Sequence, residues 1–228
     1  MTLSAQFQQA AQLEASGNVD AAARIYQQIL NANPNVGAAW HALAILVFNS
    51  GNLQQAFEMF ANAVRLEPNN AMYHRNLGEI SRRIGNLDQA ILSGKAASKL
   101  APKDVDAHYN LGLAYTDAKD YDKAILSYKK AVKLNPKHGL SWNNLGSALE
   151  QQGDKKGALK AYEKAVTLNA QHAEAQNNAG AIYSELGKLE EARQSFAAAI
   201  SARPTFVESH YNLSSLKTYT PDDPHLVM

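Results

Sequence analysis

The chain has 228 residues, with 22 basic and 21 acidic side chains and a formal net charge of +1 at pH 7. This balance excludes a general attraction to nucleic acid or to anionic membranes. The absence of cysteine excludes disulfides, thiolate metal sites and cysteine nucleophiles. No apolar run approaches the length of a membrane span, and the first residues lack the pattern of a signal peptide, so we expect a cytoplasmic address.

Proline recurs at a fixed interval along the sequence. The interval from Pro34 to Pro68 recurs from Pro68 to Pro102 and from Pro102 to Pro136, and Pro204 follows at twice that interval. A period of this length predicts an array of equivalent units. With proline at position 32 of each unit, six complete repeats span 3–36, 37–70, 71–104, 105–138, 139–172 and 173–206.

Each repeat has the pattern of two amphipathic helices. In the repeat 105–138, Ala107, Leu111 and Ala114 recur at helical spacing, and a second apolar stripe later in the repeat includes Tyr128. Neither stripe is covered within one helix pair. The pairs therefore need to stack on their neighbours to bury these stripes.

Equivalent positions of the repeats carry the same kinds of side chain. A small residue recurs in every second helix: Ala22, Ala56, Ala90, Ala124, Ala158 and Ala192. Four residues later an aromatic side chain recurs: Tyr26, Phe60, Tyr128, Tyr162 and Phe196. Glycines inside the first helices indicate close helix packing, and glycines at the turns suit a left-handed backbone. The repeat 71–104 has Ser81 and Gly94 where aromatic residues are expected, so we expect it to be the most loosely packed.

The C-terminal part departs from the repeat. Residues 207–219 supply only a first helix, which we expect to cap the apolar face of the last repeat. Residues 220–228 are rich in proline and aspartate and are expected to be a linker or the start of a further region.

These recurring positions resemble the signature of the tetratricopeptide repeat, W-x2-L-G-x2-Y followed by A-x3-F, A and P. Trp40 and Trp142 open two of the repeats. Within 105–138 nearly every signature position matches: Leu111, Gly112, Tyr115, Ala124, Tyr128, Ala131 and Pro136. The resemblance covers residues 3–217. It implies an all-α fold, a right-handed α-solenoid superhelix of helix-turn-helix units with the first helices on its concave side, and a role in protein–protein interaction.

A column of asparagines is the strongest candidate for a functional site. It comprises one asparagine at the same position of five successive units: Asn76, Asn110, Asn144, Asn178 and Asn212. Asparagine is a mediocre helix former, so its recurrence at one helical position needs a reason. An amide offers both donors and an acceptor, which suits the backbone of an extended peptide. The column is similar to the asparagine ladder of the O-GlcNAc transferase repeat domain. The alternative is structural, with amides that cap or bridge adjacent helices.

Other candidate site residues surround this column. Tyr109 and Asn143 each precede one of its asparagines, and Arg75, Arg82 and Arg83 lie on or beside the same surface in the repeat 71–104. Acidic residues occupy equivalent positions further along: Asp106, Asp117, Glu150, Glu174, Glu185 and Glu208. A groove that is basic at one end and acidic toward the other would orient a bound peptide. Incidental charge on a solvated face is the alternative.

The sequence contains no recognisable catalytic motif. It has no glycine-rich phosphate loop, no paired metal-binding histidines and no nucleophile elbow. His74, His108 and His210 share one repeat position, where each replaces the signature tryptophan, and a packing role is favoured over metal binding. We therefore predict no enzymatic activity, no cofactor and no metal.

The favoured interpretation is a non-catalytic scaffold that binds a protein or peptide segment in its concave groove, with no nucleic-acid or membrane partner. Two alternatives stay open at this level. One is the N-terminal substrate-recognition arm of a larger bacterial glycosyl- or sulfotransferase. The other is a self-assembling scaffold that contacts further copies through its repeat ends or groove.

Overall fold

The computed structural model describes residues 1–216 and contains only helices and their connections in that range. The helices form two compact units, Met1–Asp120 (unit 1) and Tyr121–Met228 (unit 2). The prediction of an all-α array of helix pairs is thereby confirmed. None of the described helices has the length and the apolar character needed to span a membrane.

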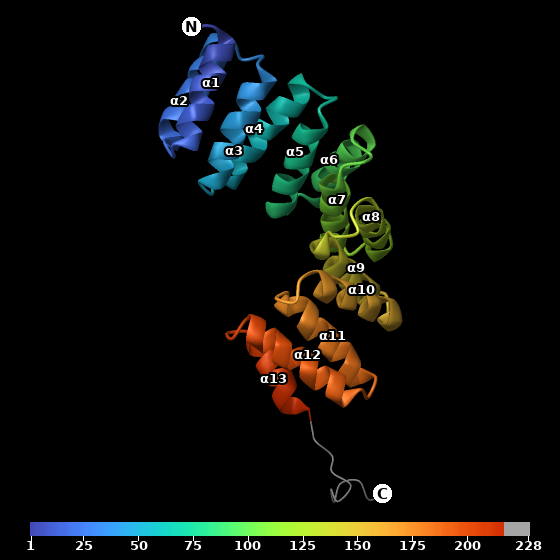
Figure 1. The fold of residues 1–228 in the computed structure, drawn as a ribbon. Helices are drawn as coiled ribbons and strands as arrows, with labels where there is room; N and C mark the ends of the chain where they lie inside the picture. The colour runs from blue at the N-terminus through green and yellow to red at the C-terminus, as the bar shows by residue number, and fades with distance from the viewer. Residues whose placement is uncertain (217–228) are drawn as a thin grey trace, which may run out of the picture. The chain divides into compact units, whose positions relative to one another are not determined.

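Unit 1 consists of helices that alternate between the first and the second helix of successive repeats. Figure 1 shows them in chain order from blue to green. They are α1 (Leu3–Ala15), α2 (Val19–Ala32), α3 (Gly37–Asn49), α4 (Leu53–Leu66), α5 (Ala71–Arg83), α6 (Leu87–Leu100) and α7 (Val105–Asp117).

Unit 2 begins with the second helix of the repeat 105–138, so the boundary between the units falls inside that repeat. Its helices are α8 (Tyr121–Leu134), α9 (Gly139–Gln151), α10 (Lys155–Leu168), α11 (Ala173–Glu185), α12 (Leu189–Ala202) and α13 (Val207–Ser215). The last of these lies within the capping helix expected over 207–219. Residues 217–219 and the expected linker 220–228 lie outside the described part of the chain.

The recurring small residues lie where helices approach most closely. The alanine column of the second helices is almost completely buried in both units: Ala22, Ala56, Ala90, Ala124, Ala158 and Ala192. A Cβ placed on Gly146 would lie 2.7 Å from the ring of Tyr162, and one on Gly180 would lie 2.8 Å from the ring of Phe196. Because real Cβ atoms do not come this close, the close helix packing predicted from the glycines is confirmed.

The turns between paired helices use a left-handed residue at position 15 of the repeat. Glycine occupies this position in most repeats, for example Gly51 with φ of 89° and Gly153 with φ of 83°. In the repeat 105–138 the same position holds Lys119, with φ of 59°. Since a side chain disfavours this conformation, Lys119 is a local source of strain in unit 1.

The repeat 71–104 packs differently from the other repeats at the two positions where it lacks an aromatic residue. Ser81 is fully buried, and its hydroxyl donates to the carbonyl of Leu77 at 2.5 Å. A Cβ on Gly94 would lie 3.0 Å from Leu111 Cδ1. The expectation of loose packing at these two positions is therefore wrong, because α6 lies close to α7 where an aromatic ring is missing.

The side chain at position 4 ties each first helix to the loop that precedes it. Trp40 Nε1 donates to the carbonyl of Pro34 at 2.8 Å. Where histidine replaces tryptophan the contact is kept, since His74 Nε2 lies 2.8 Å from the carbonyl of Pro68 and His108 Nε2 lies 3.1 Å from that of Pro102. This result confirms the packing role predicted for these histidines.

Candidate binding surface

Within each unit the asparagines of the column lie on the first helices, and we call the surface that carries them the first-helix face of that unit. All five side chains are half-buried. Asn76 Nδ2, on α5, lies 2.8 Å from Nε2 of His41 on α3. In unit 2, Asn212 Nδ2 on α13 donates to Asn177 Oδ1 on α11 at 3.1 Å. Both contacts join position 6 of one repeat to position 5 of the repeat before it, so these two amides bridge neighbouring first helices.

The remaining asparagines have different surroundings. Asn143 Nδ2 donates to Oδ1 of Asn144 at 3.3 Å, while Asn143 Oδ1 is buried and accepts no hydrogen bond within the described residues. Asn178 hydrogen-bonds the hydroxyl of Tyr162. Asn110 on α7 is half-buried, as is Tyr109 beside it. Asn178 thus contacts α10, so a contact that joins two helices is seen for three of the five amides.

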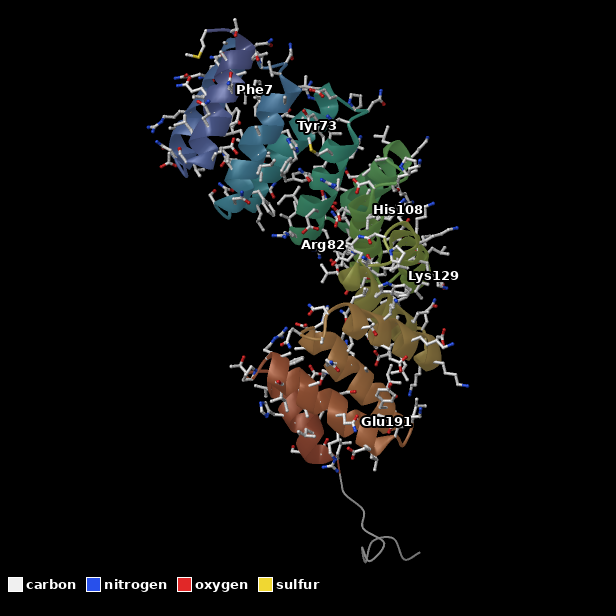
Figure 2. The ribbon with its side chains drawn as sticks, in the orientation of Figure 1. Phe7, Tyr73, Arg82, His108, Lys129 and Glu191 are labelled. Carbon is white, nitrogen blue, oxygen red and sulfur yellow. The ribbon has the colours of Figure 1, made fainter. Side chains whose placement is uncertain are left out.

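The histidine that bridges to Asn76 is held neutral by its surroundings. The His41 side chain stacks on Tyr73, with ring centroids 4.5 Å apart, and meets Phe60 edge to face at 5.6 Å. Burial, and then the positive charge of Arg75, lower the pKa of His41 to about 4. A neutral imidazole accepts a hydrogen bond at one nitrogen, which agrees with the amide N–H of Asn76 as the donor. Tyr73 is labelled in Figure 2.

The three candidate arginines of α5 already have carboxylate partners. Arg75 Nη1 lies 3.0 Å from Asp104 and 3.6 Å from Asp106. Arg82, labelled in Figure 2, pairs with Glu79 at 3.1 Å and with Asp117 at 2.9 Å.

Arg83 shares the Glu79 carboxylate and also stacks on an aromatic ring. Its Nε lies 2.6 Å from Glu79, and its guanidinium lies 4.7 Å from the centroid of Phe48. Burial raises the pKa of Glu79, but the hydrogen bonds from Arg82 and Arg83 outweigh burial and lower it below its ordinary value. The basic region expected in this repeat is therefore largely neutralised by its own acidic neighbours.

Three of the acidic candidates in unit 2, Glu150, Glu174 and Glu185, also have partners. Glu185 lies 2.6 Å from Lys155, and Glu174 forms an ion pair with Arg203. Glu150 accepts a hydrogen bond from the Tyr162 hydroxyl at 2.8 Å. The contacts within each unit thus do not show the separation into a basic and an acidic end that the sequence suggested.

A cavity of about 250 Å³ opens on the first-helix face of unit 1, between α3, α4 and α5. It is lined by Ile45, Phe48, Asn49, Phe60, Asn76 and Glu79. Asn76 therefore serves both as a helix bridge and as part of a cavity wall. We call this cavity the Phe60 pocket.

A second cavity occupies the same repeat positions in unit 2. It has a volume of about 200 Å³ and is lined by Ala181, Ser184, Glu185, Phe196, Asn212 and Ser215. Each of these residues lies four repeats after its counterpart in the Phe60 pocket. We call it the Phe196 pocket. An asparagine of the column lines each cavity: Asn76 lines the Phe60 pocket and Asn212 lines the Phe196 pocket.

Position 24 of the repeat is phenylalanine at both of these cavities and tyrosine in three other repeats. Where it is tyrosine, the hydroxyl extends toward position 12 of the same repeat: Tyr26 donates to Glu14 at 2.6 Å, and Tyr162 donates to Glu150 at 2.8 Å. Phe60 and Phe196 have no hydroxyl. A cavity lies beside each of these two rings.

Sequence reasoning missed these pockets, although a signal was present. The alternation of phenylalanine and tyrosine at position 24 is visible in the sequence, but it reads there as a conservative change within a buried aromatic column. Only the structure shows that a cavity lies beside Phe60 and another beside Phe196. No group of three or more histidine, aspartate or glutamate side chains suited to a metal ion occurs in residues 1–216.

The repeated helix pairs define an α-solenoid class of protein, and comparison with known families identifies it further. Family models described as tetratricopeptide or TPR repeats match residues 13–80, 78–118, 105–138 and 143–205. Together they cover most of the chain, which belongs to the tetratricopeptide-repeat family. Proteins of this family are generally scaffolds for protein–protein interaction. No curated protein sequence matches the chain.

Solved structures share the fold at low sequence identity. The structure of Pseudomonas aeruginosa pilF has a TM-score of 0.78 at 19% identity, covering 92% of this chain and 96% of that one. YrrB, described as a TPR protein with an unusual peptide-binding site, has a TM-score of 0.67 at 20% identity and coverages of 82% and 96%. MamA (41-end) from Desulfovibrio magneticus RS-1 has a TM-score of 0.68 at 25% identity and coverages of 74% and 96%.

Proposed function

We propose that the chain is a non-catalytic scaffold that holds an extended segment of a partner protein along its first-helix face. The observation that carries this proposal is the position of the asparagine column beside cavities that the repeats leave unfilled. Asn76 and Asn212 each line such a cavity, one in each unit. Around the Phe60 pocket, polar groups lie at the edge of an apolar cavity, which is the usual composition of a binding site.

The bridging contacts are compatible with this role and support it. In Asn76 and Asn212 the Nδ2 group is bound to the preceding first helix. Within the described residues, no hydrogen bond is donated to Oδ1 of either side chain. A fixed amide with an available acceptor suits a backbone N–H of a peptide, since little side-chain entropy is lost on binding.

The proposed partner contact does not depend on charge. The arginines and several carboxylates of this surface are paired with each other, as described above, so a partner gains little from a net charge of its own. Backbone hydrogen bonds and apolar contacts are left as the main sources of affinity. The transferase arm and the self-assembling scaffold remain hypotheses without a supporting contact in the described residues.

A display library of random dodecapeptides, selected on the immobilised chain, tests this function. The selected peptides are then measured against the variant in which Asn110, Asn144 and Asn178 are all replaced by alanine. Each lost hydrogen bond costs roughly 0.5–1.5 kcal/mol, so we expect binding to weaken more than tenfold while the variant stays folded. The matched control replaces Asn31 and Asn62, which lie on second helices, and should bind normally.

Two outcomes contradict the proposal. One is that no peptide is selected above background. The other is that a folded triple variant retains the affinity of the unaltered chain.

A further inference from the structure

The Phe60 pocket has an apolar interior. Its walls include the aliphatic side chain of Ile45 and the rings of Phe48 and Phe60, and its remaining lining residues are Asn49, Asn76 and Glu79. The Phe60 ring is 3% exposed, and the guanidinium of Arg83 lies against Phe48. Packing on both rings holds the walls in place, so the cavity is part of the folded framework.

The size of the cavity limits what it can hold. Pockets for small molecules usually measure roughly 300–1,000 Å³. At about 250 Å³ the Phe60 pocket is smaller than this range. It is suited to one large side chain that enters from a segment lying outside it.

The charges around the pocket favour an uncharged occupant. The Glu79 carboxylate in its wall is engaged by both Arg82 and Arg83. Arg82 is further neutralised by Asp117, and Arg75 by Asp104 and Asp106. An acidic or basic group placed here would have to break one of these pairs or stay unpaired in a partly buried site, which is costly.

We propose that the Phe60 pocket receives a single large aliphatic or aromatic side chain of the bound segment, while the amide of Asn76 accepts a hydrogen bond from its main chain. This inference rests on the proposed function and adds to it the chemistry of the partner. The partner is a segment without net charge at this point, with one leucine-, isoleucine-, methionine- or phenylalanine-like residue as its anchor. Apolar burial supplies the affinity, and the amide sets the direction of the main chain.

The first part of the test uses peptides selected from the dodecapeptide library. We expect them to share one large apolar residue, and replacing that residue by alanine should weaken binding at least tenfold. Replacing it by aspartate should weaken binding further. Selected peptides that lack a common apolar residue, or that tolerate alanine there, overturn the pocket assignment while the proposed function stands. A library that yields no binder overturns both.

The second part places a hydroxyl without a partner in the wall of the pocket, where an apolar anchor would have to bury it. Phe60→Tyr places a hydroxyl where Tyr26 and Tyr162 have theirs, but Phe48 at position 12 provides no acceptor. We expect this variant to keep its fold and to lose at least tenfold in peptide affinity. Phe196→Tyr is the matched control, because it makes the same change in the other pocket and leaves the Phe60 pocket open. Equal affinities of the two variants contradict the assignment.

A third measurement does not depend on the variants. The Ile45 methyl groups form part of the pocket wall, so their ¹³C resonances should shift when the capped peptide Ac-Gly-Gly-Leu-Gly-Gly-NH₂ is added. The same peptide with alanine in place of leucine is the control probe. Identical spectra with the leucine and the alanine peptide at millimolar concentration also contradict the assignment.

Discussion

The Phe60 and Phe196 pockets are built from the same six repeat positions and differ in chemistry. Positions 9 and 12 are Ile45 and Phe48 in unit 1, whereas they are Ala181 and Ser184 in unit 2. The asparagine and the phenylalanine are common to both. The comparison teaches that the same repeat positions enclose a cavity in both units, while the side chains at those positions determine what each cavity prefers to bind. The following predictions test this comparison between the two units.

The largest expected effect comes from removing the ring that each pocket shares. Phe60 and Phe196 are 3% and 2% exposed. Replacing either by alanine should lower the free energy of unfolding by about 3–5 kcal/mol, because a buried aromatic ring is lost and a cavity remains. Urea denaturation of both variants measures the loss. Similar losses for the two variants would support the same structural role for Phe60 and Phe196. Losses that differ by more than about 2 kcal/mol, the width of the expected range, would contradict it.

The second prediction concerns the bridges, which differ in their response to pH. His41 accepts the bridging hydrogen bond in unit 1, and Asn177 accepts it in unit 2. The pKa of His41 falls from 6.5 in the unfolded chain to about 4 in the folded one. Stability due to the neutral imidazole is therefore complete above pH 6.5 and is lost progressively as the pH falls toward 4. At pH 5 the loss should be about 2 kcal/mol.

Hydrogen exchange at pH 7 and pH 5 measures this effect helix by helix. After correction for intrinsic exchange rates, protection in α3 and α5 should fall more than in α11 and α13. Glu79 and Glu174, whose pKa values lie below their ordinary range, contribute only at lower pH. The variant His41→Asn copies the residue found in unit 2 and should remove the difference. Equal loss of protection in both regions would show that His41 is not its source.

The third prediction concerns the tyrosine hydroxyl at position 24, which Phe60 and Phe196 lack. Tyr162 donates to Glu150, and burial followed by this hydrogen bond raises its pKa above the ordinary value. Tyr162→Phe removes the hydroxyl and should lower the free energy of unfolding by about 1.5–3 kcal/mol, since one hydrogen bond to a charged group is lost.

Urea denaturation of this variant and of the unaltered chain measures the loss. An unchanged free energy of unfolding would show that the Tyr162 hydroxyl does not stabilise unit 2.

The smallest expected effect concerns the turns, where the repeats otherwise agree. Lys119 has a left-handed backbone at a position that holds glycine in the neighbouring repeat, Gly85 with φ of 79°. Lys119→Gly should raise the free energy of unfolding by about 0.5–1 kcal/mol, because the strain removed exceeds the added freedom of the unfolded chain. The converse change, Gly85→Ala, should lower it by a similar amount. Thermal unfolding of both variants measures the signs, and a destabilised Lys119→Gly variant would contradict this account.

Much of the architecture was predictable because it repeats locally. The regular spacing of proline, alanine and glycine indicates helix pairs, close contacts and turns without any knowledge of distant contacts. Position 4 is a similar case: His74 keeps the hydrogen bond to the preceding loop that tryptophan makes at Trp40. Each of these features depends on residues within one repeat, on the loop before it or on the shape of a single helix.

The interactions that cross between repeats were less predictable. Glu79 and Arg83 are four residues apart on α5, and this contact is readable from helical spacing. The pairing of Arg82 with Asp117, which belongs to the next repeat, is not. The sequence indicated a basic surface there, and the structure shows that its charges are matched by the next repeat. The close approach of Gly94 to Leu111 is a similar case, because the sequence suggested loose packing there and the structure shows close packing.

The sequence by itself determined the family, the helix pairs and the surface on which the asparagines lie, because all three follow from periodicity along one chain. The tertiary structure alone decided which asparagines bridge helices, which charges are neutralised and where the first-helix face is hollow. These depend on how two or three side chains from different helices share one small volume. Tyr162 donates its hydroxyl to Glu150 and Phe60 lines a pocket, although the two residues hold the same place in the repeat.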